Sequence, residues 1–280
     1  MSELRYFADW PASTLTIRGA DRTRIVHNLC TADVNKLSPG NACEAFVTNV
    51  KGHVVAHCVV CCGDDVLSLV VLAADVAELA KHFGKYIISE DATVEVASEK
   101  PLLLTGSLEG CESADGFACT LTGADAWIVL AGNIERAEQL GYQAATVEQF
   151  DALRTAAGWP LAGVDFGEST LPQELNRNEL AISFTKGCYL GQETIARLDA
   201  LGHVNKQIAV VRASPGVELS VGTTLHRDDN LVGSVTTAAL VGECWQSLAM
   251  IRRGSFAPGT QLDSEAGKVE VIAAVRPSKS

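Results

Sequence analysis

The part of the chain after Gly202 has the pattern that most restricts the fold. Short β-like runs follow one another there, and turn signals such as Ser214-Pro215-Gly216 and Asp228-Asp229-Asn230 separate them. The runs cover residues 207–212, 222–226, 231–238, 246–252 and 268–275. Five or six short strands in about 75 residues favour a small closed barrel or sandwich as a C-terminal domain.

Upstream of this region, helical and strand-like patterns alternate. Asp21 is the expected N-cap of a short helix whose apolar face includes Ile25, Val26 and Leu29. The Val-rich segment 45–60 predicts a hairpin or two strands, with a turn at Lys51-Gly52. Further strands are predicted at 66–72, 93–96 and 127–130, and further helices at 74–83, at 134–140 and after the capping box of Thr146 and Gln149. The fold class expected is α+β.

The length of the chain indicates more than one packed unit. At 280 residues and 29.6 kDa it lies near the upper limit for one domain, and a hydrophobic share of 47% is typical of a globular protein. We expect a first region over residues 1–205, with two subdomains that divide near 95–145, and a barrel domain over 206–280.

Charge and cysteine content limit the function classes. The net charge of −12 argues against a broad nucleic-acid surface, so direct nucleic-acid binding is not expected. No basic stretch followed by an apolar run opens the chain, and no window has the roughly 20 apolar residues of a membrane helix, so we expect a cytoplasmic protein without membrane contact. Nine cysteines in such a chain are expected to be reduced thiols.

Residues 158–190 are rich in Gly, Pro, Asn and Ser, and ordered loops of this length are usually functional. Near the end of the segment, Cys188 lies between two glycines and just before a helical run that begins at Gln192. The N–H groups of a helix N-terminus, with Lys186 and Arg197 nearby, would stabilise a thiolate and make this cysteine reactive. The alternative is that Cys188 is a small buried apolar residue, as most free cysteines are.

The order of residues from 186 to 193 adds information beyond their spacing. Lys186-Gly187-Cys188-Tyr189-Leu190-Gly191-Gln192-Glu193 resembles the signature of the YgfZ family, which belongs to the superfamily of the glycine-cleavage T protein, an aminomethyltransferase. The resemblance extends over most of the chain. It includes Gly19-Ala20-Asp21-Arg22, Thr31-Ala32-Asp33-Val34, Leu153-Arg154 through Gly158, and Leu171-Pro172-Gln173-Glu174-Leu175-Asn176.

The resemblance implies a T-protein fold, in which an α/β region surrounds a central channel and an antiparallel β-barrel follows. It also implies a protein that binds tetrahydrofolate or a one-carbon derivative, supports iron–sulfur cluster assembly or repair, and so supports tRNA modification. Its partners would be folate and iron–sulfur assembly or client proteins. Glu174 matches the glutamate that holds the pterin ring in relatives, and Cys188 would be the reactive centre. The other expected folate contacts are Trp10, Trp159, Asn176, Lys186, Tyr189, Gln192 and Arg197.

These expected contacts have simpler alternatives. Trp10, Trp159 and Tyr189 could stack on folate rings or pack in the core. Lys186, Arg154 and Arg197 could bind folate carboxylates, with Arg197 ranked first, or form surface ion pairs.

The chain departs from the T-protein pattern at one catalytic position. Aminomethyltransferases carry an aspartate pair where this chain has Ala56-His57, so transfer of an aminomethyl carbon has no evident acid or base here. The alternative hypotheses are nevertheless a folate-dependent transferase and a binding module without turnover. His53, His57 and Cys61 could share a strand face and bind zinc, but the signal is weak and no metal site is predicted.

Overall fold

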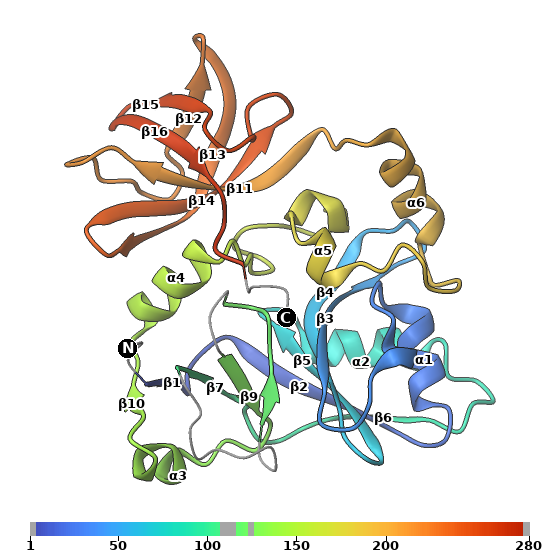
Figure 1. Ribbon diagram of the computed structural model, residues 1–280. Helices are drawn as coiled ribbons and strands as arrows, with labels where there is room; N and C mark the ends of the chain where they lie inside the picture. Colours follow the sequence, from blue (N-terminus) through green and yellow to red (C-terminus); the bar gives the residue numbers. More distant parts are fainter. Residues whose placement is uncertain (1–3, 107–115, 123–125, 277–280) are drawn as a thin grey trace.

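The computed structural model describes residues 4–106, 116–122 and 126–276. Two five-stranded sheets occupy the lower part of the molecule in Figure 1, and a closed six-stranded barrel lies above them. Short helices connect these units. The fold is therefore of mixed α and β type, as the sequence predicts, and its barrel is formed by the residues that were expected to form it.

The first sheet has the strand order β3-β4-β5-β2-β6. Its strands are β2 (Ala12–Arg18), β3 (Ala42–Thr48), β4 (Val54–Cys62), β5 (Val66–Leu72) and β6 (Thr93–Val96), and the helices α1 (Arg22–Leu29) and α2 (Val76–Gly84) cover one face, with η1 (Val34–Lys36) after α1. The β3–β4 hairpin, β5 and β6 confirm the strands predicted from alternation. Asp21 precedes α1 as expected, but its carboxylate accepts from Asp91 N and from the side chain of Arg24, and not from a backbone N–H of the helix.

The second sheet lies against the other face of the first. Its order is β10-β1-β7-β9-β8, from β1 (Arg5–Phe7), β7 (Leu102–Thr105), β8 (Phe117–Ala118), β9 (Ala126–Val129) and β10 (Gln143–Ala144), with α3 (Ile134–Gln139) on its outer side. Val59 and Cys61 of β4 face this sheet, whereas Ala56 and Cys58 face the helices. Since both faces of β4 are covered, its apolar run is nearly continuous.

The barrel encloses its own apolar core. It consists of β11 (Lys206–Ala213), β12 (Thr224–Arg227), β13 (Asn230–Val241), β14 (Cys244–Arg252), β15 (Gln261–Ser264) and β16 (Gly267–Ile272). All pairings are antiparallel, as expected. The sequence pattern missed β15, which is only four residues long and contributes one buried side chain, Leu262, to the core.

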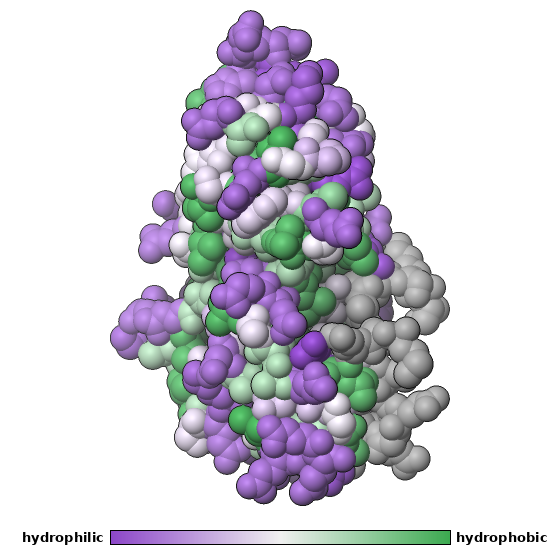
Figure 2. All heavy atoms as spheres, turned by 90° about the vertical axis from the view of Figure 1, so that its left-hand side faces the viewer, coloured by the Kyte–Doolittle hydropathy of each residue, from purple (hydrophilic) through white to green (hydrophobic). Residues whose placement is uncertain are grey.

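Four short helices join the sheets to the barrel. They are α4 (Val147–Ala156), η2 (Pro172–Leu175), α5 (Asn178–Ala181) and α6 (Gln192–Leu201). The predicted capping box of Thr146 and Gln149 opens α4, which packs against β13 and β14. Figure 2 shows the face of the molecule that lies on the left in Figure 1. Hydrophilic residues cover the upper end of this face, and apolar residues form separate groups below them. None of the helices within the described ranges has the length and apolar content that a membrane crossing requires.

Candidate functional site

The loop that carries Cys188 connects α5 to α6 and is held against the first sheet. Thr48 Oγ1 donates to Leu190 O at 2.6 Å, and Leu190 N donates to Asn28 O at 2.8 Å. Gly191 has a φ of +79°, and a Cβ there would lie 2.5 Å from Asn49 O. Only glycine fits this close approach to the β3–β4 turn. The loop is therefore fixed at its C-terminal end.

Within this loop, the thiol of Cys188 is exposed. Of the eight cysteines in the described ranges, it alone is exposed, and the others are buried or half-buried. It borders a surface hollow of about 480 Å³ together with Arg24, Asn28, Tyr86 and Glu90. The alternative of a small buried residue is therefore wrong for Cys188, whereas its reactivity stays a prediction.

Lys186 holds the same loop to the end of α1. Its Nζ donates to the carbonyl oxygens of His27, Cys30 and Ala32 at 2.5, 2.8 and 2.7 Å. Burial lowers the pKa of the Lys186 ammonium, and the ammonium also lies 4.9 Å from the centre of the Tyr189 ring. All three N–H donors are thereby used. A folate contact to Lys186, as predicted, would require some of these bonds to break.

The neighbouring residues of the signature have different environments. Tyr189 is buried, and burial raises the pKa of its hydroxyl to about 12. Gln192 begins α6, and its Oε1 accepts from Tyr189 N at 3.3 Å. Arg197, on the same helix, is exposed. Of the predicted carboxylate-binding cations, Arg197 thus remains accessible to solvent, while Lys186 does not.

Glu174 lies in η2 and is buried. Its Oε2 accepts from Leu171 N at 3.0 Å, which caps the short helix. A carboxylate oxygen has two lone pairs, so this bond leaves acceptor capacity for a ligand. Asn176 follows in the left-handed conformation with its side chain exposed, and its carbonyl accepts from Arg276. The cap uses one acceptor position of the carboxylate, and the pterin contact by Glu174 stays a prediction.

Trp10 and Trp159 belong to the core between the two sheets. They are 3% and 0% exposed, and their ring centres lie 6.0 Å apart in an edge-to-face arrangement. Trp10 Nε1 donates to Pro101 O at 2.7 Å, whereas Trp159 Nε1 has no acceptor among the described residues. Phe150 packs against both rings. Trp10 and Trp159 are therefore packed in the core, as the alternative interpretation predicts. A folate contact would require this core to open.

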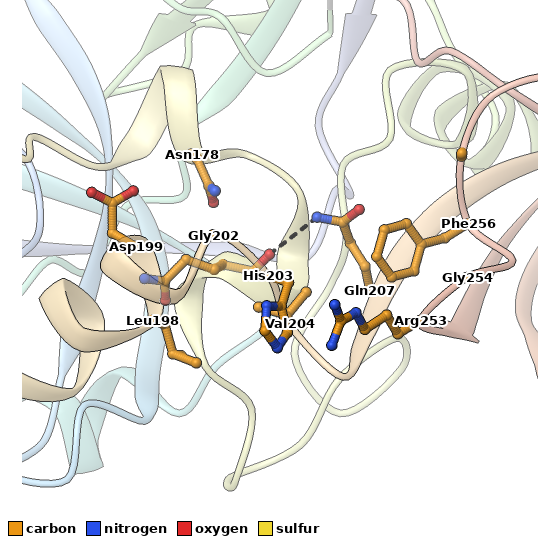
Figure 3. A pocket seen from close by; sticks show the side chains of 12 residues that line it. Asn178, Leu198, Asp199, Gly202, His203, Val204, Gln207, Arg253, Gly254 and Phe256 are labelled. Carbon is orange, nitrogen blue, oxygen red and sulfur yellow. Dashed lines mark hydrogen bonds between the residues drawn. The ribbon is translucent and has the colours of Figure 1, made fainter.

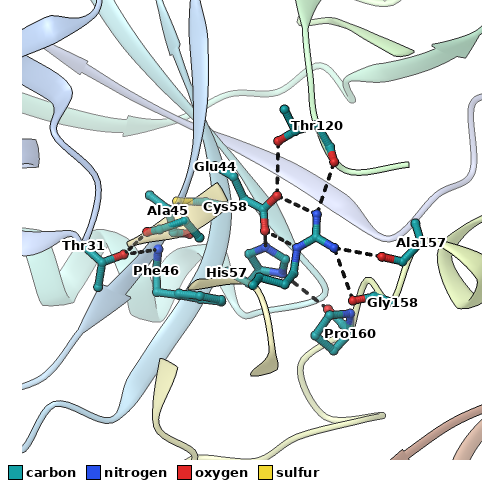
Figure 4. Close-up of polar contacts among 12 residues, drawn as sticks. Thr31, Glu44, Ala45, Phe46, His57, Cys58, Thr120, Ala157, Gly158 and Pro160 are labelled. Atoms are coloured by element: carbon teal, nitrogen blue, oxygen red, sulfur yellow. Dashed lines mark hydrogen bonds and ion pairs between the residues drawn. The ribbon is translucent and has the colours of Figure 1, made fainter. Parts of the chain in front are cut away.

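A buried charge cluster that sequence analysis missed lies where the sheets meet the connecting helices (Figure 4). Glu44 of β3 and His57 of β4 share a sheet face, and His57 Nε2 lies 2.8 Å from Glu44 Oε1. Arg177, just before α5, binds both oxygens of Glu44 through Nε and Nη2. All three side chains are at most 2% exposed. The sequence feature that could have indicated this cluster is Glu44, the single carboxylate within the apolar run of β3.

Backbone carbonyl oxygens accept the remaining hydrogen bonds of Arg177. Arg177 Nη1 donates to the carbonyl oxygens of Ala157 and Gly158, both at 3.2 Å, and Nη2 donates to Thr120 O at 3.2 Å. Burial is the largest single influence and would raise the pKa of the Glu44 carboxyl, but the charges and hydrogen bonds of Arg177 and His57 together outweigh it and lower the pKa to about 2. Glu44 is therefore an ionised carboxylate locked to a cation.

The weak zinc signal has no counterpart in the structure. His57 is engaged with Glu44, His53 lies before the first residue of β4, and burial raises the pKa of the Cys61 thiol far above its ordinary value. Within the described ranges, no group of three His, Cys, Asp or Glu residues is placed to hold a metal ion. His57 and Cys61 do share a sheet face, but they contact different partners on it.

Arg154, a predicted carboxylate ligand, instead joins α4 to the barrel. It is 3% exposed, and it donates to Asp151, Asp165 and Thr237, with Nη1 to Asp165 Oδ2 at 2.7 Å. The hydroxyls of Thr236 and Thr237 donate in turn to Asp165 Oδ1. The alternative of a surface ion pair is also wrong for Arg154, because this network is buried and structural.

The relatives found by sequence comparison share one description. A tRNA-modifying protein YgfZ of Yersinia enterocolitica is 26% identical over 244 residues, which are 78% of this chain and 73% of the relative. The YgfZ proteins of Colwellia psychrerythraea and Yersinia pestis are 24% and 27% identical, and the matched segments span 65% and 64% of their own lengths. No protein-family model matches the chain.

Structural comparison identifies a solved structure with the same fold. The glycine cleavage system aminomethyltransferase T from Bartonella henselae superimposes with a TM-score of 0.82 over 98% of this chain and 86% of the enzyme, at 16% identity. At this identity, the match defines the fold alone. The chain is thus similar in sequence to YgfZ proteins, at 24–27% identity, and it has the fold of the glycine-cleavage T protein.

Proposed function

We propose that this protein binds tetrahydrofolate or a one-carbon derivative and acts, through the Cys188 thiol, as an accessory protein in iron–sulfur cluster assembly or repair that supports tRNA modification. The observation that carries the proposal is the position of Cys188. It is the exposed member of eight described cysteines, and Lys186 and Gly191 hold its loop on either side. A thiol that is accessible on a fixed loop can react with a partner without refolding.

The folate part of the proposal is supported by the T-protein fold and by Glu174. Relatives use a glutamate at the matching position for the pterin ring, and here that carboxylate is buried and keeps acceptor capacity beside its cap. The edge of a pterin presents N–H donors, which a carboxylate accepts in short, charge-assisted bonds. The exposed guanidinium of Arg197 can bind a carboxylate of the folate tail with two parallel hydrogen bonds.

Aminomethyl transfer is the second candidate, and the site geometry disfavours it. The positions that hold the aspartate pair in the transferases are Ala56, which packs in the core, and His57, which is fully buried against Glu44. The nearby carboxylate of Glu44 is held by Arg177 with a pKa of about 2, so it would be a poor proton acceptor near neutral pH. Formation of methylenetetrahydrofolate from an aminomethylated carrier protein would restore this candidate.

Titration of tetrahydrofolate tests the folate site. Glu174→Gln keeps an oxygen that can cap η2 but loses the charge that binds the pterin edge, so affinity should fall by about 1–3 kcal/mol per lost bond. Glu168→Ala removes an exposed carboxylate six residues earlier and should leave affinity unchanged. Equal affinity of wild type and Glu174→Gln would contradict this placement of the ligand.

Complementation tests the thiol role. In a bacterial strain that lacks its own YgfZ protein and has a defect in an iron–sulfur enzyme, wild type should restore activity and Cys188→Ala should not. Cys244→Ala, which changes a half-buried barrel cysteine, is the matched control and should complement. Full complementation by Cys188→Ala, with folate binding retained, would contradict the thiol role. It would support the alternative hypothesis of a binding module without thiol chemistry.

A further inference from the structure

A pocket separate from the Cys188 loop lies where η2, α5 and α6 meet the barrel. It has a volume of about 420 Å³, and its wall contains polar side chains from the connecting helices and from the turn after β14. Its apolar lining includes Leu198 and Phe256. Neither the buried charge cluster nor the hollow beside Cys188 shares a residue with it. The pocket is therefore a separate feature of the fold.

Two amide side chains in this pocket have acceptor oxygens without a donor. Gln173 is 4% exposed, and its Nε2 donates to Ile195 O at 2.7 Å, but its Oε1 accepts no hydrogen bond from the described residues. Oδ1 of Asn178 is likewise buried and without a donor among those residues. Buried acceptors are almost always satisfied in folded proteins. Two of them in the wall of one pocket indicate a ligand that carries N–H donors.

The charged residues of the pocket are distributed unevenly. Asp199 of α6 lies with Asn178 on one side in Figure 3, whereas Arg253 and Phe256 lie on the other, with His203 between them. The wall formed by the helices thus contains the exposed carboxylate of Asp199 and, behind the pocket surface, the buried unpaired oxygens of Gln173 and Asn178, which a side-chain rotation would bring to a ligand. The side formed by the barrel presents a guanidinium and an aromatic ring.

This arrangement matches one chemical class. An ammonium group has three N–H donors and a positive charge, and three acceptors including a carboxylate suit it. A guanidinium binds a carboxylate with paired hydrogen bonds, and an aromatic ring packs against an apolar body. The two charges must lie at opposite ends of the ligand, because their partners come from opposite walls of the pocket.

We propose that this pocket binds a dipeptide-sized zwitterion, with its amine toward Gln173, Asn178 and Asp199 and its carboxylate toward Arg253. An apolar residue at the carboxylate end would pack against Phe256. The proposal is independent of the folate proposal, because it rests on different residues and names a different ligand.

Calorimetric titration of the full chain with glycyl-L-phenylalanine tests the pocket. This probe places its ring and carboxylate together and its amine at the other end. Saturable binding is expected. N-acetylglycyl-L-phenylalanine and glycyl-L-phenylalaninamide each lose one charge, and each should bind at least about tenfold more weakly. Absence of saturable binding of the dipeptide up to about 10 mM, or equal binding of a capped analogue, would overturn the proposal.

Variants of exposed residues separate the two ends without a risk to folding. Arg253→Gln should weaken the dipeptide about tenfold or more but should not weaken the amide analogue further. Asp199→Asn should weaken the dipeptide but not the acetylated analogue. Arg252→Gln, which removes an adjacent exposed charge that does not line the pocket, should change nothing. Weakening by Arg252→Gln equal to that by Arg253→Gln, or displacement of the dipeptide by tetrahydrofolate, would contradict a separate two-ended site.

Discussion

Replacement of Arg177 by Met should strongly destabilise the protein. The substitution keeps most of the volume of the side chain but removes the guanidinium from the Glu44 carboxylate. Glu44 would then be a buried anion whose remaining side-chain partners are the ring of His57 and the hydroxyl of Thr120. The carbonyl oxygens of Ala157 and Gly158 would lose the same donor.

The expected loss of unfolding free energy follows from the burial of this ion pair. Removing one partner of a buried ion pair typically costs about 3–5 kcal/mol, because the other charge is left uncompensated. The depressed pKa of Glu44 gives a similar figure. A change from its ordinary 4.5 to about 2 corresponds to roughly 3 kcal/mol of preferential stabilisation of the ionised form. We expect the free energy of unfolding to fall by about 3–5 kcal/mol.

Urea unfolding followed by tryptophan fluorescence is the assay, since Trp10 and Trp159 lie in the neighbouring core and report on its loss. Arg212→Met is the matched control. Its guanidinium also pairs with a glutamate, at 3.1 Å, but both side chains are largely exposed, at 46% and 37%. An exposed pair of this kind contributes about 0–1 kcal/mol. The contrast between the two arginines therefore isolates burial as the cause.

Acidification gives an independent measurement of the same pair. Because the folded pKa of Glu44 is depressed, its stabilisation is present above pH 4.5 and is lost as the pH falls toward 2. The difference in stability between wild type and Glu44→Gln should shrink over this range. A loss below about 1 kcal/mol for Arg177→Met, or a constant difference across the pH range, would refute the assignment of a strongly coupled buried pair.

Three further predictions concern the Cys188 loop. Lys186→Met should cost about 2–3 kcal/mol in urea unfolding, because buried carbonyls lose a donor, whereas exposed Lys51→Met should cost almost nothing. Because Cys111 lies outside the described residues, the thiol test uses a Cys111→Ser background. An aromatic disulfide reagent should modify one thiol rapidly there, and this fast phase should be absent once Cys188 is replaced by Ala; an unchanged fast phase would identify another cysteine. Gly191→Ala should destabilise more than Gly202→Ala, since both have positive φ but only the former would press a Cβ against backbone; equal losses would exclude that contact.

Several parts of the structure follow from local sequence. The Val-rich alternation from 45 to 60 and at 66–72 defines the central strands, because side chains of a strand alternate between faces and the apolar ones are buried. The capping box at Thr146 marks the start of α4 correctly, since its hydrogen bonds lie within one helical turn. The barrel was also predictable, because its strands are consecutive and mostly joined by short turns.

Other features depend on contacts between distant segments. Neither the pairing of Glu44 with Arg177, 133 residues later, nor the docking of Lys186 on the carbonyls that follow α1 leaves a periodic signal in the sequence. The second sheet was missed as a unit for the same reason, because β1 pairs with β7 and β10 far along the chain.

Most of the helices and strands, the barrel and the resemblance to YgfZ proteins could be predicted from the sequence, whereas the role of Cys188 stays a prediction. The tertiary structure was needed to show which polar residues hold the fold together and which remain exposed. The physical reason is that a buried charge must find its partners in space, wherever the chain brings them, whereas strands, turns and caps are decided by neighbours in sequence.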